Sequence, residues 1–250
     1  PILDIALERT FRSPMKQFSY EKNLSGKKTG LYFFVGGNMD TVFFICEILG
    51  IIAFSLSGAI VALKSEMDVL GVCTLGVISA IGGGIMRDLL LGITPPTSFL
   101  NPINFIVAII ISLCTFLFFA RKHNLNTNKT YEIIFLVADS IGLGLFTVQG
   151  ANLCFIVFGD KNIFLAILSG IITAVGGGAI RDIMAGKKPL IFVKHFYACA
   201  SIIGAITYAF MYLMIGEPLA SIVAIILIII LRVLAVRFHW QLPKVHYSQK

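Results

Sequence analysis

Long runs of apolar residues, separated by short polar stretches, dominate the chain from Thr41 onward. Most runs are about 20 residues long, which is the length that an α-helix needs to cross the hydrocarbon core of a membrane. A transmembrane barrel would instead show alternating apolar and polar positions in segments of ~10 residues. The pattern therefore predicts an all-α polytopic membrane bundle of seven helices, at about residues 41–62, 68–92, 102–120, 132–151, 163–185, 195–215 and 218–237.

The fourth run differs from the others because it carries several polar side chains, among them Asp139, Ser140, Thr147 and Gln149. Polar and ionisable residues inside a membrane are costly and almost always face the interior of a bundle or a water-filled cavity. We therefore expect this helix to lie inside the bundle.

The composition supports a membrane protein. Hydrophobic residues make up 57% of the chain and charged residues only 13%, with a mean hydropathy of +0.91. Soluble domains carry about 25% charged residues. The five cysteines lie singly in or beside apolar runs and are interpreted as small packing residues, so no metal site is expected.

The most unusual feature is a seven-residue sequence motif that occurs twice inside apolar runs. Residues 82–88 read GGGIMRD and residues 176–182 read GGGAIRD. A glycine inside a helix costs about 1 kcal/mol relative to alanine, so three in succession predict that the second and fifth helices are broken there. The alternative is that the glycines only allow close helix packing, as small residues do in membranes. They are Gly82, Gly83, Gly84, Gly176, Gly177 and Gly178.

The doubled phrase belongs to a longer internal repeat. Equivalent pairs 94 residues apart are Gly76 and Gly170, Ser79 and Thr173, Gly92 and Gly186, and Pro95 and Pro189; pairs 92 apart are Glu47 and Asp139, Phe54 and Phe146, and Gly58 and Gly150. Each unit holds three helices, so the second copy enters the membrane from the opposite side, as in many channels and transporters. We divide the chain into an N-terminal tail that is disordered or non-native (1–38), a first repeat (39–125), an inverted repeat (126–216), a seventh helix (217–240) and a C-terminal tail (241–250).

The basic residues are unequally distributed between the loops of the two membrane sides. Lys161 lies in a loop on one side, and the other side collects Lys64, Arg121, Lys122, Lys129, Lys187, Lys188, Lys194, Arg237, Lys244 and Lys250. The positive-inside rule places this larger set in the cytoplasm, with the start of the first helix outside and the C-terminus inside. The net charge of +7 then reflects orientation and contact with lipid headgroups, and no nucleic-acid partner is expected.

Four charged residues follow the glycines, namely Arg87, Asp88, Arg181 and Asp182. Adjacent residues on a helix do not face one another, so each arginine is expected to pair elsewhere, with Asp139, Glu47 or the aspartate of the other repeat. If the helices are straight, these charges lie near the membrane surface, and if the glycines bend them, the charges lie deeper.

We hypothesise that the Arg and Asp residues are clasps or gates in a hydrophilic pathway. Exchanging the charges of Asp139 and Arg87 should then restore the conduction that single neutralisations remove. Ser57 and Gln149 stand at equivalent positions of the first and fourth helices and add polar groups beside the same region. The alternative for the serine is a hydrogen bond back to its own helix.

An enzyme is not expected. The chain has no P-loop, HExxH or GxSxG motif, and its four histidines stand near helix ends or in the C-terminal tail. The spacing Gly82-x-Gly84 fails as a dinucleotide fingerprint because Arg87 takes the place of the third glycine. No cofactor is expected.

The two GGGxxRD phrases, the segments AFSLSGA (53–59) and DSIGLGLFTVQG (139–150), and the 3+3+1 arrangement of helices resemble the TRIC family of trimeric intracellular cation channels in its prokaryotic branch, which also carries a glycine transporter label. The resemblance covers about residues 40–240. It implies a homotrimer in the cell's inner (plasma) membrane. Each subunit would carry its own pore for monovalent cations such as K⁺ and Na⁺, formed by helices kinked at the triple glycines.

One departure from the family pattern limits what the resemblance implies. Animal members carry a lysine directly before a glycine run, tied to inositol-lipid binding, whereas Ile81 and Val175 stand there in this chain. Lipid regulation is therefore not carried over. The main rival function is a secondary transporter of glycine or another small amino acid, because inverted repeats with broken helices are equally typical of transporters. A non-conducting scaffold is a third possibility.

Overall fold

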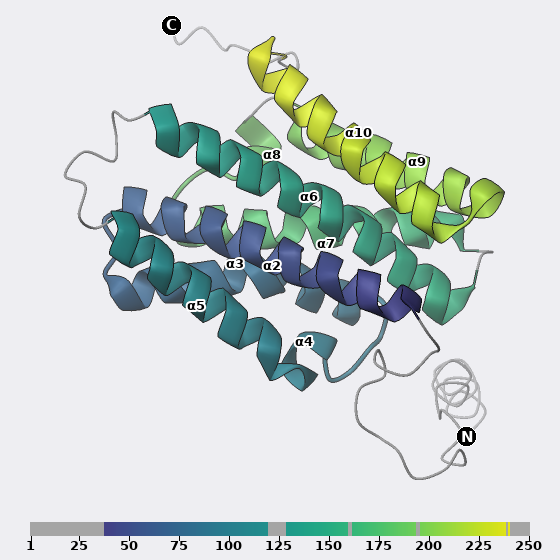
Figure 1. Cartoon of the computed structure of the whole chain (residues 1–250), viewed down its shortest axis with the longest axis horizontal. Helices are drawn as coiled ribbons and strands as arrows, with labels where there is room; N and C mark the ends of the chain where they lie inside the picture. The colour runs from purple at the N-terminus through teal and green to yellow at the C-terminus, as the bar shows by residue number, and fades with distance from the viewer. Residues whose placement is uncertain (1–37, 120–128, 160–161, 194–195, 239, 241–250) are drawn as a thin grey trace, which may run out of the picture. The chain divides into compact units, whose positions relative to one another are not determined.

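The computed structural model describes residues 38–119, 129–159, 162–193, 196–238 and 240, and these form an all-helical bundle (Figure 1). The two predicted tails lie almost wholly outside the described residues. Within the described residues, seven long helices are apolar enough to span a membrane, and they confirm the predicted fold class. The helices are α2 (Asn38–Lys64), α3 (Val69–Leu90), α4 (Thr97–Leu100), α5 (Pro102–Phe119), α6 (Lys129–Phe158), α7 (Ile163–Met184), α8 (Leu190–Val193), α9 (Tyr197–Ile215) and α10 (Glu217–Arg237).

The order of long and short helices repeats, with α2 to α5 in one half and α6 to α9 in the other. Helix α3 packs on α7, and α2 on α6, so the two halves meet through their first two helices (Figure 1). Helix α10 packs on α6 and α9, against the second half. Helix α6 is among the most deeply buried spans, as its polar residues predict.

Glycines at equivalent positions make the same contacts in both halves. A methyl group added at Gly58 would collide with the hydroxyl of Ser79, and one added at Gly150 would collide with the hydroxyl of Thr173. These are the residue pairs that the offsets of 92 and 94 align, so the structure supports the sequence repeat at the level of individual packing contacts. The close approach of α2 to α3, and of α6 to α7, requires glycine in each half.

The predicted break at the triple glycines is wrong. Helices α3 and α7 each run as one continuous α-helix through their three glycines. They end at Leu90 and Met184, the sixth residue after the last of these glycines, and two residues further on Gly92 and Gly186 adopt left-handed backbone with φ of 71° and 67°. There the next amides bond back to the carbonyls of Asp88 and Asp182, as expected for a helix C-terminus that is closed by glycine.

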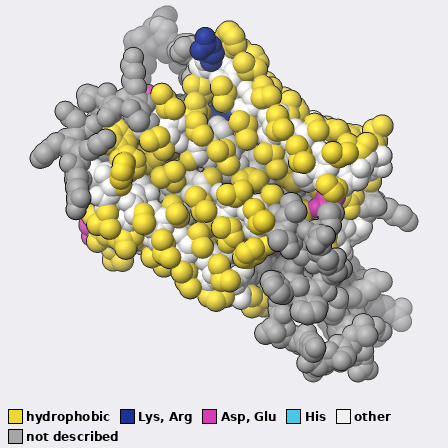
Figure 2. Space-filling view, in the orientation of Figure 1, with side chains coloured by type: hydrophobic (Ala, Val, Ile, Leu, Met, Phe, Trp, Pro, Cys, Tyr) yellow, Lys and Arg dark blue, Asp and Glu magenta, His cyan; other side chains and the backbone are white. Residues whose placement is uncertain are grey.

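The surface of the bundle is largely apolar, as a lipid-facing surface requires. The face in Figure 2 carries an almost continuous field of hydrophobic side chains, with few charges among them. Large exposed hydrophobic residues occur along each of the seven long helices, for example Ile106 and Ile110 on α5 and Ile222 and Ile226 on α10. The polar and charged side chains that lie inside the bundle therefore need a separate explanation.

Candidate functional site

The triple glycines form the contact between α3 and α7. A methyl group at Gly83 would lie 3.0 Å from the carbonyl carbon of Thr173 and still closer to its oxygen. At Gly177 it would lie 3.3 Å from the carbonyl carbon of Ser79, again closer to the oxygen. Because Ser79 and Thr173 are equivalent in the repeat, the two halves make this contact symmetrically. These glycines bring two helix backbones together, which is the alternative that the sequence left open.

The outer glycines of each run face side chains rather than backbone. Added methyl groups at Gly84 and Gly178 would lie 3.7 Å and 3.5 Å from the Nη2 atoms of Arg87 and Arg181. Gly82 faces the end of the Ile180 side chain, and Gly176 faces the sulfur of Met86. The tightest neighbours of the third glycines are the Ser98 hydroxyl at 3.2 Å from the methyl on Gly84 and the Tyr197 hydroxyl at 3.0 Å from the methyl on Gly178, so these glycines make room for Ser98 and Tyr197 beside the arginines.

Arg181 is completely buried near the end of α7. Its Nη1 atom donates to Asp139 Oδ1 at 2.8 Å and also to the hydroxyl of Ser57. Its Nε atom donates to Asp182 Oδ1 at 2.9 Å. One guanidinium thus joins α2, α6 and α7.

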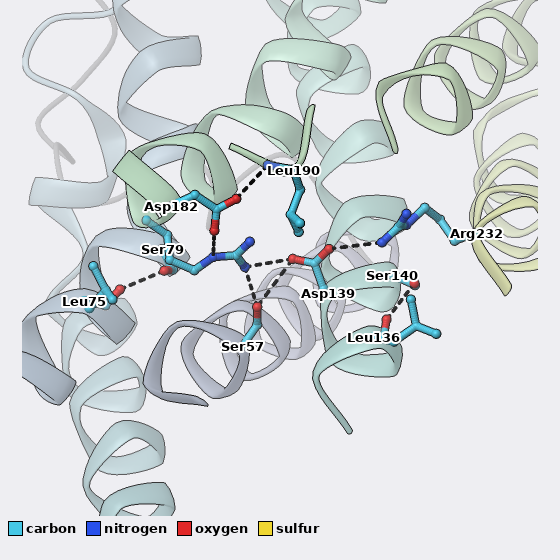
Figure 3. Close-up of polar contacts among 10 residues, drawn as sticks. Ser57, Leu75, Ser79, Leu136, Asp139, Ser140, Asp182, Leu190 and Arg232 are labelled. Atoms are coloured by element: carbon cyan, nitrogen blue, oxygen red, sulfur yellow. Dashed lines mark hydrogen bonds and ion pairs between the residues drawn. The ribbon is translucent and has the colours of Figure 1, made fainter. Parts of the chain in front are cut away.

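Two residues from the last two helices complete this group. Arg232 Nη2 of α10 lies 3.6 Å from Asp139 Oδ2, so two arginines contact the Asp139 carboxylate, which lies between α2 and α10 in Figure 3. The Arg232 guanidinium also lies over the ring of Tyr197, at 4.6 Å. We call Ser57, Asp139, Arg181, Asp182, Tyr197 and Arg232 the Arg181 cluster; all six are buried. Its two positive and two negative charges cancel.

Arg87 occupies the equivalent place at the end of α3 but has different partners. Its Nε and Nη2 atoms both lie 2.9 Å from Asp88 Oδ1, and Nη2 donates to the Thr97 hydroxyl at 3.3 Å. Glu47 is the repeat equivalent of Asp139, yet its carboxylate accepts a hydrogen bond from Asn104 Nδ2 at 2.7 Å. The two halves therefore share a backbone design and differ in how their charges are paired.

Both arginines bind the aspartate that follows them, so the expectation that each pairs only elsewhere is wrong for Arg87 and incomplete for Arg181. At these helix ends the aspartates turn toward the following segment, where Asp88 Oδ2 accepts from the Thr97 amide at 2.7 Å and Asp182 Oδ2 from the Leu190 amide at 2.9 Å. The long arginine side chains reach the other carboxylate oxygen. The rule on facing positions concerns the direction of Cβ, which such long side chains overcome.

A small pocket lies beside Arg87, among α2, α3, α5 and α6. Its polar lining consists of Glu47, Arg87, Ser98, Asn104 and Gln149, and its apolar lining includes Ile51, Ile81 and Phe146. It has room for about one water molecule. In the other half, Tyr197 occupies the space beside Gly178 that Ser98 occupies beside Gly84. The larger phenol fills the Arg181 cluster, and the smaller serine leaves a pocket.

A layer of apolar side chains belongs to the core between the two polar groups. It contains three pairs of repeat equivalents, namely Ile51 and Leu143, Phe54 and Phe146, and Ile81 and Val175. The rings of Phe54 and Phe146 touch, with centroids 5.1 Å apart. Phe54 lies against Gly142 and Phe146 against Gly50, again in equivalent positions. We call these six residues the hydrophobic layer.

The sequence left open whether the two arginines lie near the membrane surface or deeper in the bundle, and the structure has features of both alternatives. Because α3 and α7 are unbroken, Arg87 and Arg181 stand within one turn of the helix ends, near the expected membrane surface. Their side chains are nevertheless buried inside the bundle. Ser57 donates to Asp139 Oδ1 on α6 at 3.4 Å, so its hydroxyl bonds across the bundle, which differs from the alternative of a bond back to its own helix.

Several residues of the site were missed from sequence. Asn104 and Arg232 are polar residues within apolar spans, and that alone marks a candidate functional position in a membrane helix. Tyr197 had no such signal, because aromatic residues are common in apolar runs, and Phe54 was marked only by its repeat equivalence to Phe146. Their roles depend on which residues lie across the bundle from them.

The structure also brings predicted cytoplasmic lysines together. Lys187 lies near Lys64. Burial is the larger cause, and repulsion from Lys64 the next, of a lowered pKa of Lys187. Both belong to the set that the loop distribution assigned to one side. This end of the bundle also holds the Arg181 cluster.

Comparison with known proteins relates both repeats of the bundle to one family. The sequence profile of the family described as Glycine transporter matches residues 44–120 and 136–213, which are the two repeats. The chain is 35% identical over 199 residues to the UPF0126 inner membrane protein YadS of Escherichia coli K12, covering 79% of this chain and 93% of YadS. It is 34% identical to the UPF0126 membrane protein YvgT of Bacillus subtilis 168, covering 80% and 94%.

Solved structures match in fold as well as in sequence. A TRIC cation channel whose structure addresses conductance is 43% identical, with a TM-score of 0.73 over 84% of this chain and all of the solved one. The TRIC trimeric intracellular cation channel orthologue from Rhodobacter sphaeroides is 29% identical, with a TM-score of 0.71 over 80% of this chain and all of the other.

Proposed function

Because the chain belongs to the TRIC family, which is also described as the glycine transporter family, we propose that it is a membrane channel for monovalent cations, K⁺ and Na⁺ among them. The single observation that carries the proposal beyond the resemblance is the set of charged and polar side chains buried inside one subunit, between helices whose outer surfaces are apolar. Buried charges in a membrane bundle are costly and mark pathways for ions or polar solutes.

The proposed pathway runs between α2, α3, α6 and α7 within each subunit. It begins at the pocket beside Arg87, crosses the hydrophobic layer and ends at the Arg181 cluster. In the present conformation it is closed twice, by apolar packing in the middle and by ion pairs at one end. The triple glycines act in this scheme by holding α3 against α7, rather than as the kinks that the sequence predicted.

Charge pairing favours a channel for cations over a carrier of glycine. A carrier of a zwitterion needs a free positive side chain or the N-terminus of a broken helix for the carboxylate, and a negative group for the ammonium. Helices α3 and α7 are unbroken at their glycines, so they offer no half-helix N-terminus there. Arg87 is already engaged by Asp88 and Thr97, and Arg181 by two carboxylates. The pocket therefore offers Glu47 to a cation and lacks an unengaged arginine for a carboxylate.

Recordings from the purified full-length protein in planar bilayers test the function. In symmetric KCl we expect unitary currents of about picoampere size, as ion flux through a pore produces. When the KCl concentrations on the two sides differ, we expect a reversal potential that follows the K⁺ gradient. Saturable glycine uptake into vesicles without such currents would establish the transporter instead. If neither currents nor glycine uptake are observed, the protein is a non-conducting scaffold.

The hydrophobic layer supplies a sharper test of the pathway. An apolar constriction closes a pore by excluding water, so a polar residue in the layer should hydrate it. We expect Phe146→Ser to raise the open probability in bilayers at least about threefold. Phe155→Ser is the matched control, because Phe155 is equally buried but packs on Tyr208 and Tyr212, outside the layer. Equal currents from both variants would place the pathway elsewhere.

We further propose that three copies of the chain assemble, each with its own pathway, in the cell's inner membrane. The proposal is supported by the trimeric state named for the Rhodobacter sphaeroides orthologue and by the inner membrane location named for YadS. The clustering of Lys64 and Lys187 supports the expected orientation, with the Arg181 cluster toward the cytoplasm and the pocket toward the outside.

A further inference from the structure

We propose that the pocket beside Arg87 is a binding site for one monovalent cation, held by oxygen atoms of Glu47, Asn104 and Gln149. The inference rests on the proposed channel function and adds where the ion binds, which half of the subunit binds it and which atoms are its ligands. The three residues come from α2, α5 and α6, and all line the same pocket.

The first argument is an unsatisfied acceptor. Asn104 is 2% exposed, and its Nδ2 atom donates to Glu47, but its Oδ1 atom is buried without a hydrogen-bond partner. A buried carbonyl oxygen without a partner costs free energy unless a donor or a cation reaches it. Because Asn104 lines the pocket, an occupant of the pocket can satisfy this oxygen. A cation accepts oxygen ligands from an amide and a carboxylate together.

The second argument is the charge difference between the two equivalent sites. In the Arg181 cluster, two arginines face two aspartates and the charge is zero. At the pocket, Arg87 stands against Asp88 and Glu47, so one negative charge is left over. The seventh helix causes this difference, because its Arg232 has no repeat equivalent in the first half. A single monovalent cation would balance the pocket as Arg232 balances the cluster.

The third argument concerns the class of ion. One carboxylate and two amide oxygens give little charge, whereas Ca²⁺ and Mg²⁺ sites use six or more oxygens or several carboxylates. A site with one negative charge and neutral oxygens suits a monovalent ion that must also leave again for conduction to occur. The position beside the hydrophobic layer would make it the last binding site before the apolar barrier.

Thermal unfolding of the detergent-solubilised full-length protein tests the site without relying on current. In KCl, compared with N-methyl-D-glucamine chloride at equal ionic strength, we expect a saturable rise of the unfolding temperature. In Glu47→Gln, which keeps an acceptor for Asn104, the K⁺ concentration for half of the rise should increase at least about tenfold. Glu66→Gln removes the same charge from an exposed turn and should leave the K⁺ response unchanged. Asn104→Leu should weaken the response without removing the charge.

Each outcome decides between readings. An equal K⁺ response in the wild type, Glu47→Gln and Asn104→Leu, or no response in the wild type, overturns the site. A rise of the unfolding temperature with glycine instead of K⁺, abolished in Glu47→Gln, overturns the cation as occupant. If the wild type gives bilayer currents but no K⁺ response, the channel function is supported and the binding site is refuted. If it gives a Glu47-dependent K⁺ response but no currents, the binding site is supported and the channel function is refuted.

Discussion

Substituting Gly83 or Gly177 by alanine is expected to disrupt folding, although alanine is the better helix former. In the interior of a helix the change alone should stabilise by about 1 kcal/mol. Here the new methyl group would enter the carbonyl of Thr173 or Ser79, which is backbone and cannot turn away. Helices α3 and α7 would have to separate, and overpacking of this kind costs about 1–3 kcal/mol or more. We expect thermal unfolding in detergent to show a net loss for each variant and the double variant to express poorly.

Neighbouring glycines of the same runs supply the control. The tight contact of Gly82→Ala would be with the end of the Ile180 side chain at 3.2 Å, and that of Gly176→Ala with the side chain of exposed Met86, both of which can move. The backbone atoms near these two methyl groups lie at ordinary van der Waals distances of 3.7 Å and 3.5 Å. These variants should be neutral or stabilised by up to about 1 kcal/mol. The sign of the change thus separates close packing from flexibility. If all positions of a run respond alike, the glycines act through helix bending and the packing explanation is wrong.

The sequence predicted the helices and their duplication correctly, because both leave direct marks on the chain. A run of about 20 apolar residues has few other structural solutions in a membrane. The offsets of 92 and 94 residues aligned Gly58 with Gly150 and Ser79 with Thr173, and the structure places each pair in equivalent contacts. Repeated glycines could be recognised because contacts between backbones tolerate no other residue.

The prediction of helix breaks was wrong because it used the helix propensity of glycine alone and did not take account of the helix that packs against the glycines. Three glycines lower the stability of an isolated helix, but tertiary packing routinely overrides such preferences. Gly83 and Gly177 lie 94 residues apart, and only the folded chain shows that each is the other's neighbour. The same limit applies to Asp139. Its expected exchange partner was Arg87, whereas its ion-pair partners are Arg181 and Arg232.

The difference between the two halves could not be predicted from the repeat, because a repeat alignment reports what the halves share. Glu47 aligns with Asp139, and Arg87 aligns with Arg181. The two aligned carboxylates, Glu47 and Asp139, nevertheless bind different side chains. The longer carboxylate of Glu47 binds Asn104, and the shorter one of Asp139 binds two arginines. The asymmetry arises from α10, which lies outside the repeat and adds Arg232 to one half only.

Neutralising Arg181 is expected to cost about 3–5 kcal/mol of stability, because it leaves buried carboxylates without their main partner. Arg181 is 0% exposed and pairs with both Asp139 and Asp182. We expect Arg181→Gln to unfold at a clearly lower temperature than the wild type. Arg87→Gln is the matched control from the other half. Among the described residues, the ion-pair partner of Arg87 is Asp88, which would keep its bonds to Thr97, so a loss of about 1–2 kcal/mol is expected there.

The pair of Arg181 with Asp139 can be separated from the rest of the cluster by a double-mutant cycle. Asp139→Asn alone should destabilise, because two arginines lose their shared carboxylate. The double variant Arg181→Gln with Asp139→Asn leaves Arg232 and Asp182, whose charges cancel, so it should recover part of the loss. It should also conduct more than the wild type, since the ion pair that joins α6 to α7 would be gone. Strictly additive losses, or equal losses for Arg87→Gln and Arg181→Gln, would mean that the buried ion pair adds no coupling energy. Currents of the double variant no larger than those of the wild type would mean that the ion pair does not close this end of the pathway.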